Sequence, residues 1–269
     1  MRPNTLLFAC SIAALSFTAS CVDPDEDNLG EETSALSSIA LHSLTSDTYD
    51  TKDLGGSFFR SCFLTSIAGD ISTSFAPLEG PAGAGVVVVD GHWQLYVRPS
   101  SGSVTAKAAC VNAFPSSTVT WSTGQANQVL TSTTSGKKCF LTEVTTSKNQ
   151  TYLVGGLHTD SDVVRITSTG GNWVLGGSTA GLVTAKARCI DVTSSSVEMG
   201  VWAPAGQSLN TQTSILDADH SCFLTRMNGH FDSEGTGLLM FRALGPYSSA
   251  YYWSLEATNA SGGGMRCVD

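Results

Sequence analysis

The chain lacks a surplus of positive charge. Its 269 residues include 14 lysines and arginines against 23 acidic residues, which gives a net charge of −9. Six of the acidic residues lie within residues 22–34, so the rest of the chain is close to neutral. Proteins that bind nucleic acid usually present a clustered basic face. The composition therefore argues against nucleic acid as a partner, and it shows no charge that would attract anionic lipid.

The sequence also lacks a hydrophobic run long enough to span a membrane as a helix. The longest run, residues 6–19, has 14 residues, whereas a membrane-spanning helix takes about 20. A short apolar run that follows a basic residue, here Arg2, is typical of a signal peptide. We expect residues 1–20 to be a signal peptide, and any membrane contact of the exported protein to depend on an attached lipid.

Cys21 follows this segment directly, after the small residues Thr18, Ala19 and Ser20. This order resembles the lipobox of bacterial lipoproteins, in which the cysteine is lipidated and becomes the mature N-terminus. The resemblance covers about 21 residues and implies a lipid attached at Cys21. Thr18 departs from the family pattern, which has a large aliphatic residue at that place. Cleavage by an ordinary signal peptidase, followed by secretion, is therefore the alternative.

Residues 21–33 are acidic and have few apolar side chains. Such a segment cannot bury enough apolar surface to offset the conformational entropy lost on ordering. We expect it to be a flexible tether. With the lipobox, it predicts a protein of the bacterial cell envelope, anchored to the outer membrane or the cell surface.

The chain contains one phrase three times, and this repetition dominates the sequence. Each copy of Cys-Phe-Leu-Thr is followed by a Trp-x-Leu and then by a second cysteine. The copies begin at Cys62, Cys139 and Cys222, the tryptophans are Trp93, Trp173 and Trp253, and the closing cysteines are Cys110, Cys189 and Cys267. Internal repeats determine the architecture of a chain. We expect three repeats of about 78 residues, at 34–112, 113–191 and 192–269.

The six cysteines of the repeats are single and far apart, unlike the paired cysteines of zinc sites, so no metal is expected. Disulfides in an oxidising compartment suit them better. Repeat symmetry allows two simple patterns. Either each repeat closes on itself (Cys62 with Cys110, Cys139 with Cys189, Cys222 with Cys267), or each bridges to the next (Cys110 with Cys139, Cys189 with Cys222, Cys62 with Cys267). We favour the first, because a unit of this size has a marginal core that a disulfide would stabilise.

Signals for helices are nearly absent, whereas signals for strands are frequent. Residues 86–89 and 92–97 are apolar runs on either side of Asp90-Gly91, a dipeptide favoured in two-residue hairpins. Alternation in residues 104–110 places Val104 and Cys110 on one face of a last strand. The chain is therefore predicted to be all-β, with three disulfide-linked sandwich or barrel units packed closely. The short joints between repeats suit units in a row, which we favour, or units about a pseudo-threefold axis.

No motif for a known catalytic mechanism is present: the sequence has no G-x-S-x-G elbow, H-E-x-x-H or P-loop. Two clusters could hold a metal or orient a general base, but loop composition explains both. They are His220 with Asp217 and Asp219, and His158 with Asp160 and Asp162. We therefore expect neither enzymatic activity nor a cofactor. A secreted hydrolase that uses His220 and Asp219 is retained as an alternative.

A basic residue stands two places before the first cysteine of each repeat: Arg60, Lys137 and His220. Around an axis these side chains would form a ring able to bind an anionic group such as a phosphate or a uronic acid. The residues that follow the repeated threonine diverge instead, as Ser66, Glu143 and Arg226. A repeated scaffold with variable positions suits binding. The prediction is a non-enzymatic binding or adhesion module, with carbohydrate or another envelope protein as its partner; a structural envelope or appendage component is the alternative.

Overall fold

The computed structural model of the chain describes residues 41–72, 81–147, 156–192, 195, 198–216, 220–244 and 251–268. The expected signal peptide, Cys21 and the acidic tether lie outside the described residues. Within the described ranges the chain forms strands and no helix. It follows that this part of the chain has no helix with the length and apolar character needed to cross a membrane.

Each repeat contributes six strands within the described ranges. The first contains β1 (Leu41–Ser46), β2 (Asp50–Gly56), β3 (Ser61–Gly69), β4 (Ala82–Val89), β5 (His92–Arg98) and β6 (Val104–Val111). The second contains β7 (Val119–Ser122), β8 (Gln128–Ser132), β9 (Lys137–Ser147), β10 (Val163–Thr169), β11 (Asn172–Ser178) and β12 (Leu182–Asp191). The third contains β13 (Met199–Trp202), β14 (Ser208–Leu216), β15 (Ser221–Gly229), β16 (Gly237–Leu244), β17 (Tyr251–Thr258) and β18 (Ser261–Val268).

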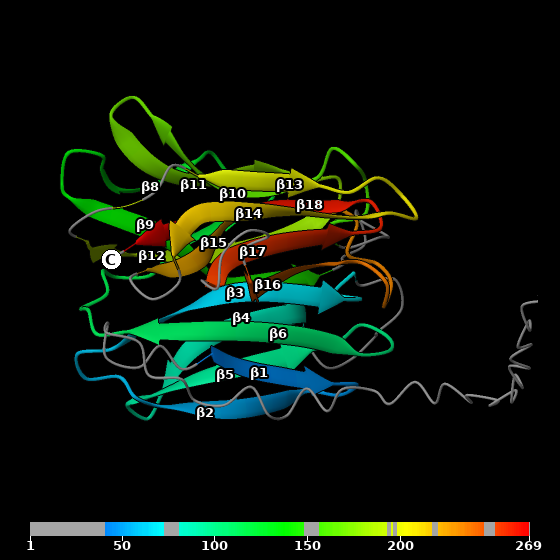
Figure 1. Cartoon of the computed structure of the whole chain (residues 1–269), viewed down its shortest axis with the longest axis horizontal. Coiled ribbons are helices and arrows are strands. Elements are labelled where there is room, and N and C mark those ends of the chain that lie inside the picture. The colour runs from blue at the N-terminus through cyan, green and yellow to red at the C-terminus, as the bar shows by residue number, and fades with distance from the viewer. Residues whose placement is uncertain are drawn as a thin grey trace, which may run out of the picture. The chain divides into compact units, whose positions relative to one another are not determined.

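The strands form three six-stranded sheets, and each sheet combines strands from two repeats. Their orders are β1-β6-β3-β16-β17-β14, β2-β5-β4-β9-β12-β7 and β13-β18-β15-β10-β11-β8. We name the sheets after the two strands that join the repeats: the β3–β16, β4–β9 and β10–β15 sheets. In Figure 1 the cyan strand β3 lies beside β16, although the two are far apart in sequence. The all-β class and the three repeats are confirmed. Because the third repeat pairs back onto the first, the repeats surround a common axis and do not stand in an open row.

The predicted hairpin joins β4 to β5. Asp90 and Gly91 form its turn with φ of 50° and 81°, as a two-residue loop between twisted strands requires. The second repeat uses Gly170 and Gly171 at the same place between β10 and β11, with φ of 57° and 77°. The turn residues therefore determine this hairpin locally.

The disulfides close each repeat on itself, as the favoured pattern predicted: Cys62 with Cys110, Cys139 with Cys189, and Cys222 with Cys267. In each pair the two cysteines lie directly opposite each other on adjacent antiparallel strands. Alternation along β6 is also as expected, because Val104 is fully buried and Lys107 is partly exposed. The disulfides lie on the buried face of the sheets.

The repeated tryptophans belong to the hydrophobic core. Trp93 and Trp253 are 1% and 0% exposed. The indole Nε1 of Trp93 donates a hydrogen bond to the Arg60 carbonyl at 2.7 Å, and that of Trp253 donates to the His220 carbonyl at 2.9 Å. These bonds attach β5 and β17 to the residue that precedes β3 and β15. The tryptophans are therefore framework residues.

A second, smaller cluster joins the three repeats at their common axis. The rings of Phe63, Phe140 and Phe223 lie 4.9 to 5.2 Å apart, centroid to centroid, and all three are fully buried. Neighbouring residues of a strand point to opposite faces. Each phenylalanine therefore turns toward the axis while the cysteine before it turns into its own repeat. We call these three residues the axial cluster.

Candidate binding site

The three basic residues of the predicted ring each engage a partner in their own repeat. The carbonyls of Arg60 and His220 accept the tryptophan indoles described above. The Lys137 Nζ lies 3.1 Å from a carboxylate oxygen of Asp191. Lys137 is on the same face of β9 as Cys139, because residues two apart in a strand share a face. The backbone carbonyls of Arg60 and His220 and the side chain of Lys137 therefore each have a partner within their own repeat, and a ligand bound by the three side chains stays a prediction.

The cluster of His158, Asp160 and Asp162 is a turn held by one carboxylate. Asp162 is 1% exposed and accepts hydrogen bonds from the backbone N–H groups of His158, Thr159 and Ala180 at 2.6 to 2.8 Å. Asp217 and Asp219 lie outside the described residues. No three histidine, cysteine or acidic side chains converge on a possible metal position anywhere in the described ranges.

The three repeats differ most clearly at one place on each sheet. A line of residues crosses the middle strands of each sheet. One residue of the line follows the repeated threonine, one lies on β4, β10 or β16, and one is the third residue after the repeated tryptophan. Partners in register share a face. We call this line the central row. It contains Glu143, Gly85 and Tyr96 in the β4–β9 sheet, and Arg226, Arg165 and Gly176 in the β10–β15 sheet. In the β3–β16 sheet it contains Leu239 and Glu256, and Ser66 accepts a hydrogen bond from the Met240 N–H beside them.

In the β4–β9 sheet the central row is filled and its charges are balanced. Glu143 is 7% exposed, and its Oε1 lies 2.8 Å from the Nζ of Lys186. A Cβ on Gly85 would lie 2.8 Å from Glu143 Cγ and 2.9 Å from the Tyr96 ring, so only glycine leaves room for both side chains. Burial first, and then the charge of Glu143, raise the pKa of Tyr96 above its usual range. This row is a closed structural contact.

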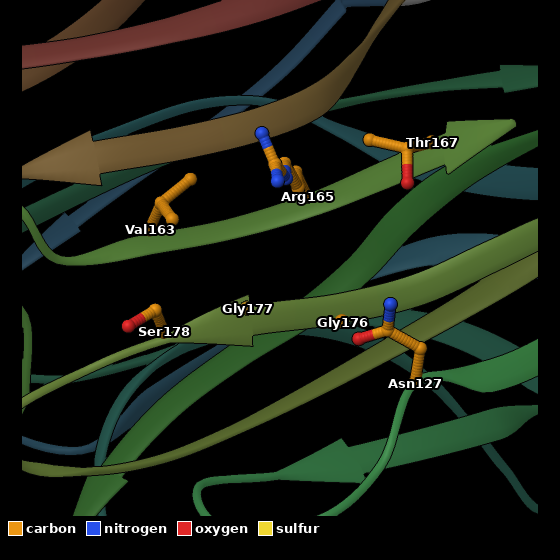
Figure 2. A pocket seen from close by; sticks show the side chains of 7 residues that line it. All are labelled: Asn127, Val163, Arg165, Thr167, Gly176, Gly177 and Ser178. Atoms are coloured by element: carbon orange, nitrogen blue, oxygen red, sulfur yellow. The ribbon is translucent and has the colours of Figure 1, made fainter. Parts of the chain in front are cut away.

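In the β10–β15 sheet the central row opens into a cavity of about 90 Å³. Figure 2 shows Arg165 and Thr167 on β10, with Asn127 beside Gly176. The lining residues are Asn127, Val163, Arg165, Thr167, Gly176, Gly177 and Ser178. A Cβ on Gly176 would lie 2.0 Å from the Asn127 Oδ1, so the glycine is what allows Asn127 to occupy this position. The cavity combines one cation, one amide and two hydroxyl groups.

Arg226 faces Arg165 across the β10–β15 strand pair. Its Nη2 donates to the Gly263 carbonyl at 3.2 Å, and its Nε lies 3.9 Å from a carboxylate oxygen of Glu198. Its guanidinium occupies the space above Gly200, where a Cβ would lie 2.1 Å from Nη2. Arg165 is exposed and, among the described residues, has no carboxylate partner.

Glu198 also acts on a third arginine. Burial lowers the pKa of Arg266, and the nearby charge of Glu198 opposes that effect. The Arg266 guanidinium lies 4.4 Å from the centre of the Trp173 ring, a cation–π geometry. One carboxylate therefore serves both Arg226 and Arg266. In the described part of this region the positive charge of Arg165 is not balanced.

An exposed aromatic patch, formed by Phe58, Phe59 and Phe114, lies next to the start of β3. These residues are 82%, 50% and 58% exposed, and neighbouring rings are 4.2 and 4.3 Å apart. Phe59 has a φ of 56°, a left-handed conformation that bulky residues rarely adopt. The equivalent residue of the second repeat, Gly136, has a φ of 74°. Both described copies of this position have the left-handed conformation, and only the first repeat fills it with an aromatic residue.

The sequence did not reveal the cavity, because the glycines within residues 176–181 are more typical of a turn than of a strand. Gly176 and Gly177 are instead the last part of β11, and Gly176 pairs with Arg165. The divergence at Arg226 was visible in the sequence. Aligning the repeats on their tryptophans as well as on their cysteines would have placed Tyr96 and Gly176 at the same position. Arg165 itself carried no signal.

The chain is not matched by any protein-family model. No curated protein sequence matches it significantly either.

Proposed function

We propose that this chain is an exported, non-enzymatic binding module of the bacterial cell envelope, that a glycan is its ligand, and that the β10–β15 cavity is its binding site. One observation carries the proposal. The central row built around Arg165 combines an open cavity with an exposed cation, whereas the equivalent row of the β4–β9 sheet is filled. Where a repeated scaffold departs from its own symmetry, function is the expected reason.

The side chains of the cavity suit sugar hydroxyls. Asn127 offers both a donor and an acceptor, Thr167 and Ser178 each offer a hydroxyl, and Arg165 offers several donors in a planar fork. Binding pockets fix a ligand with a few convergent polar groups of this kind. The cavity itself is small, so it would hold one group of a sugar while the rest of the glycan lies along the sheet.

The three disulfides indicate a protein that folds outside the cytoplasm, since such bonds form and persist in oxidising compartments. The signal peptide, the lipid on Cys21 and the placement at the outer membrane or cell surface belong to the proposal. A Cys21→Ser variant should lose metabolic labelling by a fatty acid and leave the membrane fraction. Labelling that persists in the variant would contradict the anchor.

A broad panel of glycans tests the proposed function directly. Saturable binding of the full-length exported protein to a subset of the panel, or to polysaccharide on whole cells, is expected. Indifference to the entire panel would contradict it.

A second candidate is a structural envelope or appendage component. The exposed aromatic patch favours it, because exposed clusters of large apolar side chains often mark protein interfaces. This function predicts self-association or one fixed protein partner in place of glycan binding. Analytical ultracentrifugation of the wild-type protein and of Phe58→Ser separates the two, since only an interface at this patch would be weakened by the substitution.

A further inference from the structure

We propose that the β10–β15 cavity recognises an acidic sugar, and that Arg165 binds the carboxylate of that sugar. This inference rests on the proposed glycan-binding function and specifies its ligand class. A uronic acid bears such a carboxylate beside ring hydroxyls, which matches the mixed polar lining of the cavity.

The charges on the β10–β15 strand pair favour an anionic ligand. Like charges directly opposite each other on paired strands destabilise a sheet. Arg165 and Arg226 are paired in this way, and Glu198 lies 3.9 Å from Arg226 only. Glu198 also serves Arg266. A ligand carboxylate at Arg165 would supply the missing negative charge.

The size of the cavity and the shape of the guanidinium suit a carboxylate. A cavity of about 90 Å³ is larger than the space one water molecule needs, so it admits a small polar group. That volume suits a carboxylate with its attached carbon. The planar guanidinium of arginine donates two parallel hydrogen bonds to such a group, a geometry that lysine lacks. Gly176, opposite Arg165 in register, has no side chain of its own, and the Asn127 amide takes that space and lines the cavity there.

The β4–β9 sheet has the same place filled by a carboxylate of the protein itself. In the β4–β9 sheet, Gly85 replaces Arg165 and Glu143 replaces Arg226. There the side chain of Glu143 lies over the glycine, and Lys186 balances its carboxylate at 2.8 Å. The central row thus already accommodates a carboxylate with a cation in one sheet. In the β10–β15 sheet the cation is provided by the protein and the carboxylate would come from the ligand.

Calorimetric titration of the full-length protein tests this inference with four probes. They are a galacturonate oligosaccharide, a neutral maltooligosaccharide, a sulfated oligosaccharide and inorganic phosphate. We expect the galacturonate to bind most tightly, and added salt to weaken its binding, because exposed charges are screened.

Three substitutions accompany the titration. Arg165→Gln should weaken galacturonate binding by about tenfold or more, the usual loss for a charge-assisted hydrogen bond. Lys52→Gln removes the same charge from an exposed residue of β2 and should change nothing. Glu198→Gln removes the nearby carboxylate and should tighten binding by about threefold, since the local positive potential rises. Thermal unfolding of each variant verifies that the fold is kept.

The opposite signs expected for Arg165→Gln and Glu198→Gln make the test decisive, because loss of folding weakens binding in both. Equal affinity of wild type and Arg165→Gln, or tighter binding of phosphate or the sulfated probe, would overturn the inference. Binding of the neutral probe alone would overturn it and leave the glycan-binding function standing. Binding of no glycan would overturn both.

Discussion

The aromatic rings of Phe63 and Phe140 meet with their centroids 5.2 Å apart, although the two residues belong to different repeats. Phe223 of the third repeat completes the axial cluster, at 5.1 and 4.9 Å from the other two rings. Each phenylalanine stands between a disulfide cysteine and a core leucine in the same repeated phrase. One phrase therefore supplies both the bond that closes a repeat and the contact that joins the repeats. Its repetition is explained by the framework.

Removing one ring of the axial cluster should destabilise the whole protein. Phe140→Ala deletes a fully buried ring and leaves a cavity between three repeats, so the free energy of unfolding should fall by about 3 to 5 kcal/mol. Urea denaturation followed by tryptophan fluorescence measures the loss. Phe114→Ala, at a residue that is 58% exposed, should change the value by no more than about 0.5 kcal/mol. Similar losses for both substitutions would contradict the role of the axial cluster.

Removing one disulfide should also lower stability, by a different mechanism. Cys139 and Cys189 are 50 residues apart, and a cross-link over a loop of that length stabilises by about 4 kcal/mol in the chain-entropy treatment. The double substitution Cys139→Ala/Cys189→Ala should show this loss in urea denaturation. Adding a reductant should then lower the stability of the wild-type protein further than that of the variant, because the variant has one bond fewer to lose. An equal effect of reductant on both would contradict the assignment.

Sequence reasoning predicted the features that depend on neighbouring residues. The Asp90-Gly91 hairpin follows from turn geometry, and the alternation that buries Val104 follows from strand geometry. The disulfides follow from the repeat and from the marginal size of its core. The exchange of strands between repeats could not be predicted, because the β3–β16 pairing depends on tertiary packing. The cavity was missed for the same reason: Arg165 and Arg226 are neighbours only through that kind of pairing.

The ion pair in the central row of the β4–β9 sheet should respond unequally to loss of either partner. Glu143 is 7% exposed, whereas Lys186 is 34% exposed and can reach water alone. Lys186→Met leaves a buried carboxylate without a cation and should lower the free energy of unfolding by about 2 kcal/mol. This loss is smaller than that expected for a fully buried pair. Glu143→Gln should cost about 1 kcal/mol, the value of an ordinary hydrogen bond. Urea denaturation of the two variants compares these costs, and the reverse order would contradict the account.

Tyr96 should make the protein sensitive to alkali. Burial, and then the charge of Glu143, raise its pKa in the folded protein above the usual value for tyrosine. A group whose pKa is raised on folding makes its full contribution to the stability of the folded protein below its unfolded pKa, which is about 10 for tyrosine. That contribution is lost as the pH rises above the unfolded pKa. The wild-type protein should therefore lose more stability than Tyr96→Phe between about pH 8 and pH 11. Equal losses in urea denaturation at the two pH values would show that Tyr96 is not responsible.

At residue 59, substitution by glycine should give a more stable protein than substitution by alanine, which is the reverse of the usual order. The φ of 56° at Phe59 lies in the left-handed region, which costs residues with a Cβ about 1 kcal/mol or more and costs glycine nothing. Phe59→Gly should therefore be more stable than Phe59→Ala by about 1 kcal/mol in urea denaturation. At Phe58, which does not share that conformation, alanine should be the more stable by about 0.5 kcal/mol or more. The second repeat provides a matched test, since Gly136→Ala should destabilise by about 1 kcal/mol at a φ of 74°. If Phe59→Ala were more stable than Phe59→Gly, the backbone at residue 59 would not be strained. The left-handed turn would then be a relaxed feature of the first repeat.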